Sequence, residues 1–572
     1  MTIRERSLTD PTFTTVDTMD QLTNAIQTAA TNGTTVRVRG AMHSVRDAIL
    51  ADAPSGTNLI LGGDFQDVVF VDPATPTVRV GGGRRLGGDP DENVPATDGL
   101  LYWLANQKPP LSVPDLGGIT HQSVGGFLST GSSGGSLKYS FEDAIEAIEF
   151  VDGTGQQHVV EPDMEGDFAA FGVSMGLFGV ITSVVLKPNA RFAIVGTEST
   201  RDIDKAAFKP FAPGPSGLQA YLTAEDYCRI MWWPQSGVEK LVTWQAARAV
   251  LTSGFVPNPY RELGDPNENP TSYPPELWST LVPRLALALI ANAPAIFALF
   301  ERYRDTLPPD MTEFIKRTLA TIVKEGPEGL KKILQTAMDS EVQQFGVDLY
   351  FSLLGNRVTS ELGRDLFKGI FDNEATFEAK WSPLIMNGIF LIDDAAKKKP
   401  GAQQFQDYGD TGLPMDDQIS DLLMPTEFTE LWIPIDRTVD VMTALDTHYK
   451  AGGYAATGTY ACELYGTKAS DFWMSPAYAE DVIRVDLFWF GRNGDSTPQQ
   501  FYQQFWDALR LANLPFRPHW GKFLPPPATY GKAYYETVYP HLDDFLALRQ
   551  KYDPKQVFVT DYWRNQFSIP TP

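Results

Sequence analysis

The stretch VRVRGAMHS, residues 36–44, decides the fold. The alternation of valine and arginine over 36–39 predicts a short strand, and Gly40 allows a tight turn after it. The backbone N–H groups of such a turn point outward and form a concavity that suits an anion such as pyrophosphate. The turn also presents Met42, His43 and Ser44. A single histidine after a strand is otherwise typical of a core or surface residue, so the other motifs of the chain must decide its role.

Helix and strand patterns alternate on both sides of this turn. Apolar residues with helical spacing cover 22–30, and the helix is expected to end at Asn32-Gly33. Short β-branched strands follow, and the last of them covers 176–187 (GLFGVITSVVLK) after a glycine turn. We expect residues 1–195 to form the first domain of an α+β fold.

The remainder of the chain differs in pattern. Residues 196–500 predict a second domain built on an antiparallel sheet, and 501–572 predict a segment that returns to the first domain. A helix-rich block over about 276–370 is expected as an insertion, and 395–412 has the composition of a solvated loop. The strand patterns lie at 229–233, at 241–244 and, after the insertion, between 429 and 487.

The composition excludes several classes of protein. The chain has 572 residues, 43% hydrophobic and 21% charged, so it can bury a large core. Its formal net charge of −24 repels phosphate backbones, which argues against nucleic-acid binding. Cys228 and Cys462 are too few for a disulfide framework or a cysteine-rich metal site, and we expect no metal.

No segment has the features of a membrane anchor or a signal peptide. The longest apolar run, 285–300 (LALALIANAPAIFALF), is shorter than the roughly 20 residues that a spanning helix needs. It is either a buried helix or an apolar lid over a greasy substrate. The first residues, MTIRERSLTDPTF, contain no apolar stretch. We therefore expect a cytoplasmic protein without stable membrane insertion, and its oligomeric state stays open.

A glycine-rich stretch covers residues 122–140, QSVGGFLSTGSSGGSLKYS. Glycine and serine cannot fill a core, so either a ligand approaches this backbone closely or the stretch is a flexible loop. Gly131-x-Ser133-x-Gly135 has the form of the hydrolase GxSxG motif, but its flanks lack the strand–turn–helix context which that motif requires. The nicotinamide pattern GxGxxG and the P-loop pattern are absent.

A third motif, RPHWGK, covers residues 517–522. Pro518 and Trp520 stiffen the segment, while His519 offers a hydrogen-bond donor and Lys522 a cation. An ordinary aromatic loop is the alternative interpretation.

In this order the motifs resemble the vanillyl-alcohol-oxidase type of flavoproteins, which share their FAD-binding fold with p-cresol methylhydroxylase. VRVRGAMHS is similar to the family's pyrophosphate loop, and SVGGFLSTGSSGGSL with FEDAIEAIEFVDGTG is similar to the stretch that follows it. RPHWGK and YDPKQVFVTDYW resemble the C-terminal end of the alditol and sugar-1,4-lactone oxidase branch. The resemblance covers about 12–195 and 427–572. It implies a two-domain FAD-binding fold of the p-cresol-methylhydroxylase (PCMH) type.

The resemblance implies FAD as the cofactor, attached covalently through His43, because a histidine in the family's loop often forms this bond. A second bond through cysteine is not expected, since neither cysteine lies in the first FAD segment. The residues expected to bind FAD are Arg39, Gly40, Ala41, Met42, His43, Ser44, Ser123, Gly125, Gly126, Ser129, Thr130, Ser133, Gly135, Gly179, Val180, Ile181, His519 and Lys522.

The same resemblance implies a substrate site around Glu463. In alditol oxidases a Glu-x-Arg stands ten residues before a Trp-x-Ser-Pro, which is found here at 473–476. The glutamate is kept, but the arginine is replaced by Tyr465. The histidine that follows Ser-Pro in those oxidases is replaced by Asp486, and Ser133 stands where relatives have a histidine after TGT.

Four residues are the candidates for catalysis. Glu463 is expected to align or deprotonate a substrate hydroxyl, and Tyr465, two residues along the same strand face, to donate a hydrogen bond. Lys522 is expected to polarise the substrate oxygen or to stabilise reduced flavin. Asp486 is the fourth candidate. For Glu463 and Lys522 a structural salt bridge is the alternative.

These features predict an FAD-dependent oxidoreductase that oxidises an alcohol-type substrate by hydride transfer to flavin N5. The resemblance places the residue that controls access of O2 to the flavin within TGSSG, residues 130–134, and the small side chains there leave the approach open, so we expect O2 as acceptor and H2O2 as product. Two alternatives remain. The departures at the substrate site and the apolar insertion favour a bulky, sterol-type alcohol over a sugar, polyol or lactone, and a flavin-binding protein without turnover is the other possibility.

Overall fold

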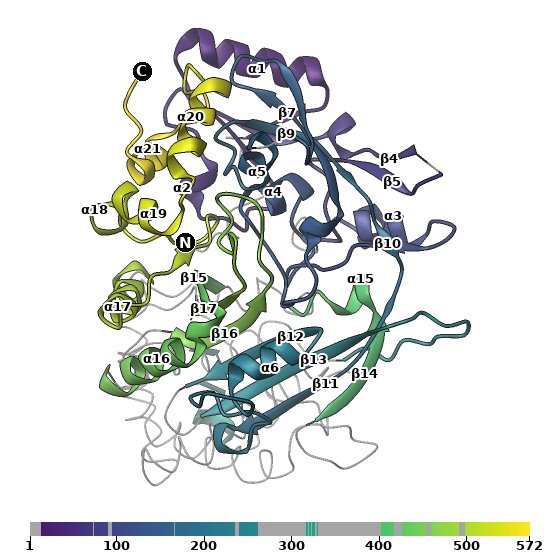
Figure 1. Ribbon diagram of the computed structural model, residues 1–572, viewed down its shortest axis with the longest axis vertical. Helices are drawn as coiled ribbons and strands as arrows, with labels where there is room; N and C mark the ends of the chain where they lie inside the picture. The colour runs from purple at the N-terminus through teal and green to yellow at the C-terminus, as the bar shows by residue number, and fades with distance from the viewer. Residues whose placement is uncertain are drawn as a thin grey trace.

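The structure is a computed structural model, shown in Figure 1. It describes residues 13–72, 74–89, 94–164, 166–234, 239–260, 402–416, 426–452, 459–490 and 498–572, with a few more between 316 and 329. The apolar run at 285–300 lies outside the described residues, as does nearly all of the expected insertion at 276–370.

The N-terminal part begins with a parallel sheet in the order β1-β3-β2, made of β1 (Phe13–Val16), β3 (Thr57–Leu61) and β2 (Val36–Arg39). The helix α1 (Met19–Asn32) packs on it through Leu22 and Ile26. Thr18 begins the helix by accepting a hydrogen bond from the Gln21 N–H, and Gly33 ends it with a φ of +66°. Glycine adopts this left-handed conformation without strain, so the helix ends where the sequence predicted.

A five-stranded antiparallel sheet follows, in the order β4-β5-β9-β7-β8. Its strands are β4 (Val68–Asp72), β5 (Thr77–Gly81), β9 (Gly179–Leu186), β7 (Ile145–Asp152) and β8 (Gln157–Val160). Every residue of the central strand β9 is buried, because α4 (Val124–Ser129) packs against it. The shorter elements α2 (Arg46–Ile49), α3 (Leu100–Ala105), α5 (Asp167–Gly172), β6 (Leu111–Ser112) and β10 (Asn189–Ala190) complete this part.

The second large element is an eight-stranded sheet in the order β14-β11-β13-β12-β16-β17-β15-β18, antiparallel throughout. Its strands are β11 (Ala193–Asp202), β12 (Tyr227–Trp233), β13 (Lys240–Ala249), β14 (Gln403–Tyr408), β15 (Thr426–Pro434), β16 (Thr459–Thr467), β17 (Val482–Phe490) and β18 (Arg517–Pro518). The helices α6 (Leu218–Ala224), α16 (Thr438–Gly452) and α17 (Pro498–Leu511) share one apolar core with it (Figure 1). The α+β fold class with an antiparallel second sheet is confirmed.

One expectation of local structure was wrong. Residues 403–408 of the supposed solvated loop form β14, and 409–412 form the short helix α15 (Gly409–Gly412). The strand lies at the edge of the sheet, so only alternate residues, Gln403, Phe405 and Asp407, are buried. With a single apolar residue among those three, the strand has the composition of a loop.

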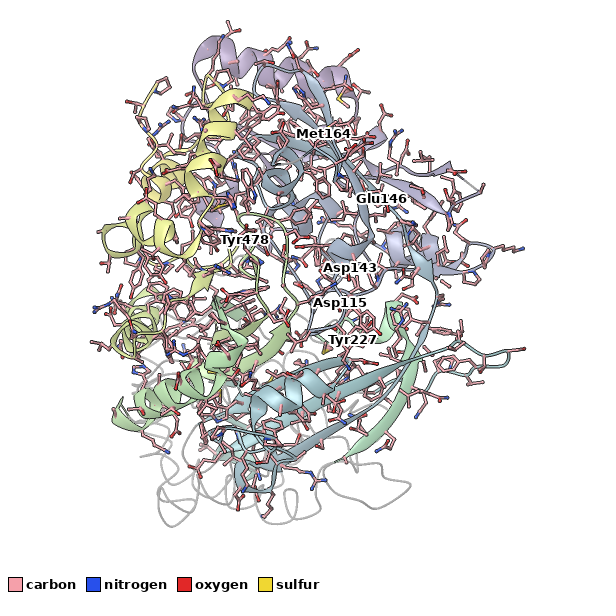
Figure 2. All side chains as sticks on the ribbon, in the orientation of Figure 1. Asp115, Asp143, Glu146, Met164, Tyr227 and Tyr478 are labelled. Carbon is pink, nitrogen blue, oxygen red and sulfur yellow. The ribbon has the colours of Figure 1, made fainter. Side chains whose placement is uncertain are left out.

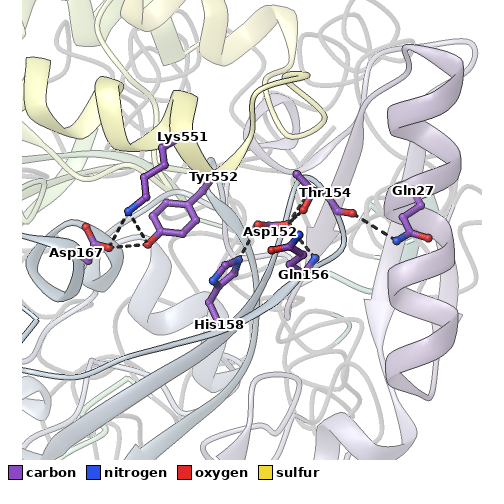
Figure 3. Close-up of polar contacts among 8 residues, drawn as sticks. All are labelled: Gln27, Asp152, Thr154, Gln156, His158, Asp167, Lys551 and Tyr552. Atoms are coloured by element: carbon purple, nitrogen blue, oxygen red, sulfur yellow. Dashed lines mark hydrogen bonds and ion pairs between the residues drawn. The ribbon is translucent and has the colours of Figure 1, made fainter.

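The C-terminal helices α18 (Pro527–Tyr530), α19 (Lys532–Val538), α20 (Leu542–Tyr552) and α21 (Asp561–Phe567) lie beside the N-terminal part (Figure 1). Figure 3 shows one of the polar contacts that join them. Tyr552 at the end of α20 donates a hydrogen bond of 2.6 Å to Asp167 of α5, and Lys551 lies 3.4 Å from the same carboxylate. Next to it, a hydrogen bond of 2.7 Å between His158 Nε2 and Asp152 Oδ2 ties β7 to β8. The exact division into domains stays a prediction.

No helix in these described ranges has both the length and the apolar character needed to cross a bilayer.

Candidate functional site

A cleft opens between the turn after β2, the start of β9 and the C-terminal segment. It encloses about 970 Å³ of space free of protein atoms, part of which is open to solvent. The residues expected to bind FAD that line it are Arg39, Gly40, Ser44, Ser123, Gly125, Gly126, Ser129, Thr130, Gly179, Val180 and Ile181. Residues from 39–44, 123–130 and 179–181, which are far apart in the sequence, therefore meet at one cleft.

The walls of this cleft approach each other backbone to backbone. A Cβ atom on Gly40 would lie 2.3 Å from Ser123 Oγ, and one on Gly125 would lie 2.9 Å from the Gly82 carbonyl oxygen. Met42 has a φ of +62°, a left-handed conformation that is uncommon in residues other than glycine. Unusual backbone of this kind is concentrated at functional sites, and glycine-lined walls allow main-chain groups to reach a phosphate.

A second, smaller cavity adjoins the cleft and shares Gly40, Ser123 and Thr130 with it. It is lined by the remaining residues of the turn, Ala41, Met42 and His43, together with His519 and Lys522. Lys522 Nζ donates a hydrogen bond of 3.3 Å to the His43 carbonyl oxygen. The two ends of the chain thus meet in this cavity.

The tautomer of His519 follows from its contacts. Its Nδ1 accepts a hydrogen bond of 3.1 Å from the Gly521 N–H, so in the neutral ring Nε2 carries the proton and donates it to Ser132 Oγ at 3.3 Å. Burial lowers the pKa of His519 to about 4, so the ring is neutral near pH 7.

Two residues expected to bind FAD do not line either cavity. Ser133 accepts a hydrogen bond of 2.8 Å from Arg484 Nη1 through its carbonyl oxygen. A Cβ atom on Gly135 would lie 2.2 Å from the Cys228 carbonyl oxygen and 2.7 Å from the Tyr465 ring. The glycine-serine loop therefore touches the eight-stranded sheet at these two positions.

Side chains of the eight-stranded sheet separate by face, because successive residues of a strand point to opposite sides. Leu464 and Val485 belong to the apolar core beneath α6, α16 and α17. Glu463 and Asp486 point to the other face and lie directly opposite each other in the register of β16 and β17. In the next row, Tyr465 lies opposite Arg484.

The face of the sheet that carries Glu463, Asp486, Tyr465 and Arg484 is called the polar face below. Further charged residues extend it. Arg229 of β12, which is fully buried, lies 3.7 Å from Glu463 Oε1 and 3.5 Å from Glu198 Oε2, and it donates a hydrogen bond to Asp416. Arg484 Nη2 lies 3.0 Å from Asp486 Oδ2, and its Nε lies 3.4 Å from Glu430 Oε1. Each cation thus serves more than one carboxylate.

Burial and neighbouring charges shift the protonation of these carboxyl groups. Desolvation raises the pKa of Glu463 well above its ordinary value; Asp416 raises it further, and Arg229 opposes the shift. Desolvation likewise raises the pKa of Asp486 well above its ordinary value, and Arg484 opposes that shift. Within the described part of the chain, Glu463 Oε1, Asp486 Oδ1 and Tyr465 Oη have no hydrogen-bond partner. Unpaired buried groups of this kind are candidates for contact with a ligand.

A further buried carboxyl group, Asp115, lies at the junction of the N-terminal part and the large sheet (Figure 2). Burial raises its pKa to about 8. Nearby, Tyr227 of β12 donates a hydrogen bond of 2.7 Å to the Pro114 carbonyl oxygen and so fixes this junction.

Sequence reasoning named Glu463, Tyr465, Asp486 and Lys522, whose roles stay predictions, but it did not name the cations of the polar face. Arg229 stands in the apolar strand YCRIMWW and Arg484 in VIRVDLFWF. A charged residue inside a strand of large apolar residues is the signal that was available, because such a strand is buried and its charge needs a partner. In the described residues, no group of three or more His, Cys, Asp or Glu is arranged to hold a metal ion.

Comparison with known sequences agrees with the resemblance stated above. The model of the family described as D-arabinono-1,4-lactone oxidase matches residues 416–566. This range contains the strands of the polar face from β15 to β18 and the segment with His519 and Lys522.

Three curated relatives match parts of the chain. D-arabinono-1,4-lactone oxidase from Debaryomyces hansenii is 25% identical over 41% of this chain and 40% of its own. L-gulonolactone oxidase from Bos taurus is 24% identical over 24% of this chain and 29% of its own. Alditol oxidase from a Streptomyces species is 25% identical over 24% of this chain and 30% of its own. The chain spans less than half the length of each.

Solved structures show the same fold. A cholesterol oxidase from Brevibacterium sterolicum aligns with 97% of this chain and 94% of its own at a TM-score of 0.59 and 14% sequence identity. The two-domain architecture of PCMH type is therefore shared, and this likeness concerns the fold alone.

The buried neutral state of His519 predicts a pH dependence of stability. The unfolded chain binds a proton at this histidine near its ordinary pKa of 6.5, whereas the folded protein binds it only near 4. The free energy of unfolding should therefore fall by about 3 kcal/mol between pH 6.5 and pH 4 through this group. The His519→Gln protein, which cannot take up this proton, should lack that part of the slope in denaturant titrations. Replacing His541, whose side chain is 36% exposed, is the matched control. Parallel slopes for the wild type and His519→Gln would contradict the assignment.

Proposed function

We propose that this protein is an FAD-dependent oxidoreductase that oxidises a CH–OH group of a small molecule, with O2 as the acceptor and H2O2 as the product. The observation that carries this proposal is that a cleft and a buried sheet face lie next to each other. A glycine-walled cleft with a histidine and a lysine at its end adjoins a buried sheet face, on which Glu463 Oε1 and Asp486 Oδ1 have no hydrogen-bond partner among the described residues. The loop at 130–135 touches both, because Thr130 lines the cleft and the Ser133 carbonyl binds Arg484.

The cleft fits FAD. The turn at 40–44 and the facing Ser123 and Gly126 would hold the pyrophosphate through main-chain groups and hydroxyls, which needs no net positive charge. The cavity with His43, His519 and Lys522 would receive the ring system. When bound, FAD supplies the hydride acceptor and passes the electrons on to O2.

The residues of the polar face supply the proton chemistry. Glu463 and Asp486 lie opposite each other in register, and burial raises the pKa of both, which favours a proton on one member of the pair. Such a pair offers an acceptor for the substrate hydroxyl proton and a donor that orients its oxygen. Tyr465 offers a further hydroxyl, and Lys522 offers a cation whose Nζ donates a hydrogen bond to the His43 carbonyl oxygen.

The substrate is proposed to be a polyol, sugar or lactone. Buried carboxyl and phenol oxygens that have no hydrogen-bond partner among the described residues favour substrates that bring their own hydroxyl groups, because an apolar ligand would leave these atoms without one. The names of the curated relatives point to the same class. A sterol-type alcohol is the competing outcome in the test below, and a flavin-binding protein without turnover is the other.

The purified protein should be yellow, and anaerobic mixing with a panel of polyols, aldonolactones, sugars, sterols and aryl alcohols should bleach it with at least one polyol, sugar or lactone. Admitting air should restore the colour and release H2O2. Bleaching by sterols alone would overturn the substrate class. Absence of flavin would overturn the proposed function, and slow reoxidation in air would indicate that the electron acceptor is not O2.

We propose further that His43 forms the covalent bond to the flavin, since it lines the cavity expected to receive the ring system. Acid precipitation of the wild type should leave a yellow pellet, and His43→Ala should release the colour into the supernatant. His121 is a sharp control, because its ring lies 5.5 Å from that of His43. His121→Ala should keep the pellet yellow, and the opposite result would move the attachment to His121.

Removing both carboxyl groups of the pair should abolish its acid/base contribution. The double variant Glu463→Gln/Asp486→Asn should bind FAD normally but be reduced by its substrate about 10²–10⁴-fold more slowly. Rapid-mixing measurements of flavin reduction test this. Glu480→Gln, whose carboxylate is 43% exposed, is the control and should keep the wild-type rate. An unchanged rate in the double variant would place the reaction elsewhere.

A further inference from the structure

The two carboxyl groups that face each other on β16 and β17 have different surroundings. Asp486 is bound end-on by Arg484, whose Nη2 lies 3.0 Å from its Oδ2. For Glu463, the cation in the described contacts is Arg229, at the longer distance of 3.7 Å. Arg229 also serves Glu198 and Asp416, so its charge is divided among three carboxylates.

The position of Arg484 is fixed from several sides. Its guanidinium lies 3.9 Å from the centroid of the Tyr465 ring, the residue directly opposite in register. Its Nη1 donates to the Ser133 carbonyl oxygen at 2.8 Å, and its Nε lies 3.4 Å from Glu430. A planar guanidinium held in this way cannot swing from Asp486 to Glu463 without losing these contacts.

We propose that Arg484 decides which carboxyl group of the pair is ionised: Asp486 is the carboxylate that accepts the substrate proton, and Glu463 is the protonated partner that donates a hydrogen bond. Arg484 is then a positioning residue that acts through Asp486. The role of Asp486 as base depends on the proposed function, whereas the order of protonation does not. In the reaction, the hydroxyl O–H bond breaks and its proton moves to Asp486 Oδ1. The carbon that bears this hydroxyl loses its hydrogen as a hydride, which would pass to the flavin proposed above, and the C–O bond becomes a C=O bond.

The charges around the pair support this order. The groups around the pair are Arg229 on β12, Asp416 after β14, Glu430 on β15, Tyr465 on β16, Arg484 on β17 and Lys522 after β18. Behind them, Glu198 on β11 contacts Arg229, and His519 after β18 acts on Glu430. The largest charge effect on the pKa of Asp486 after desolvation is that of Arg484, which lowers it. For Glu463 the corresponding effect is that of Asp416, which raises it. The distances and the neighbouring charges thus both favour an ionised Asp486 and a protonated Glu463.

Infrared difference spectra test the order without substrate or turnover. A protonated carboxyl group has a C=O band that an ionised one lacks. At neutral pH, the spectrum of wild type minus Glu463→Gln should contain this band, and that of wild type minus Asp486→Asn should not. Loss of the band in Asp486→Asn, or its presence in neither difference, would overturn the proposal. Should Asp486→Asn fail to fold, Glu463→Gln alone still decides.

Kinetics then separate the roles. Asp486→Asn should slow flavin reduction about 10²–10⁴-fold, whereas Glu463→Gln, which keeps a neutral hydrogen-bonding group, should lose less than about tenfold in the rate of flavin reduction.

Arg484→Gln should move the pH midpoint of flavin reduction upward by about 1–2 units, because the pKa of Asp486 rises without the neighbouring cation, and Arg484→Lys should restore most of that shift. Equal losses in the two carboxyl variants, or an unmoved midpoint in Arg484→Gln, would contradict the assignment. If the infrared order holds but no substrate reduces the flavin, the proposed function fails and the order stands.

Arg191 provides the matched control. It also lies over an aromatic ring, 3.7 Å from the Tyr408 centroid, and is bound to a buried carboxylate, Asp410, at 2.7 Å. Arg191→Gln removes the same kind of stacked and paired arginine outside the site. Its expected effect is on thermal stability, with the infrared band and the pH midpoint unchanged. A shift of the midpoint in this variant as large as in Arg484→Gln would show that the effect is not specific to the site.

Discussion

The two-residue period of the β-strand is the constraint on which this structure depends. In β16, Leu464 joins the apolar core under the helices, while its neighbour Glu463 faces the opposite side; Val485 and Asp486 repeat this division in β17. A slip of one residue in either strand would place a carboxyl group in the core and an aliphatic side chain in the site. The packing of the helices therefore holds the site in register.

Burying the charged groups of the polar face costs free energy, which the packing of the rest of the sheet offsets. Removing a charge from water is expensive, and a buried ion pair recovers this cost only when geometry and hydrogen bonds are good. Arg229 and Arg484 each contact several carboxylates, yet acids outnumber cations around them. One consequence is that the pKa values of Glu463 and Asp486 are raised well above their ordinary values, and another is that some polar atoms have no hydrogen-bond partner among the described residues. Both properties suit a site that exchanges protons with a ligand.

The cleft and the sheet are joined by contacts between distant parts of the chain. The Val45 N–H donates to the Gly521 carbonyl oxygen at 2.8 Å, and Lys522 reaches the His43 carbonyl oxygen. The Ser133 carbonyl is bound by Arg484 of the large sheet. The turn at 40–44, the C-terminal segment and the polar face are thus connected to one another, and glycine permits the close approach of their backbones.

The sequence by itself determined the local features. The strand at 36–39, the end of α1 at Gly33 and the glycine-walled loops follow from short-range rules of backbone geometry, and the motifs identified the turn with His43 and the segment with His519 and Lys522. Only the tertiary structure decided which strands are neighbours. β12, β16 and β17 bring Arg229 and Arg484 to Glu463 and Asp486, although more than two hundred residues separate β12 from the other two strands. Alternation shows which residues of one strand share a face, but the charge beside each of them depends on pairing between distant segments, which no local pattern encodes.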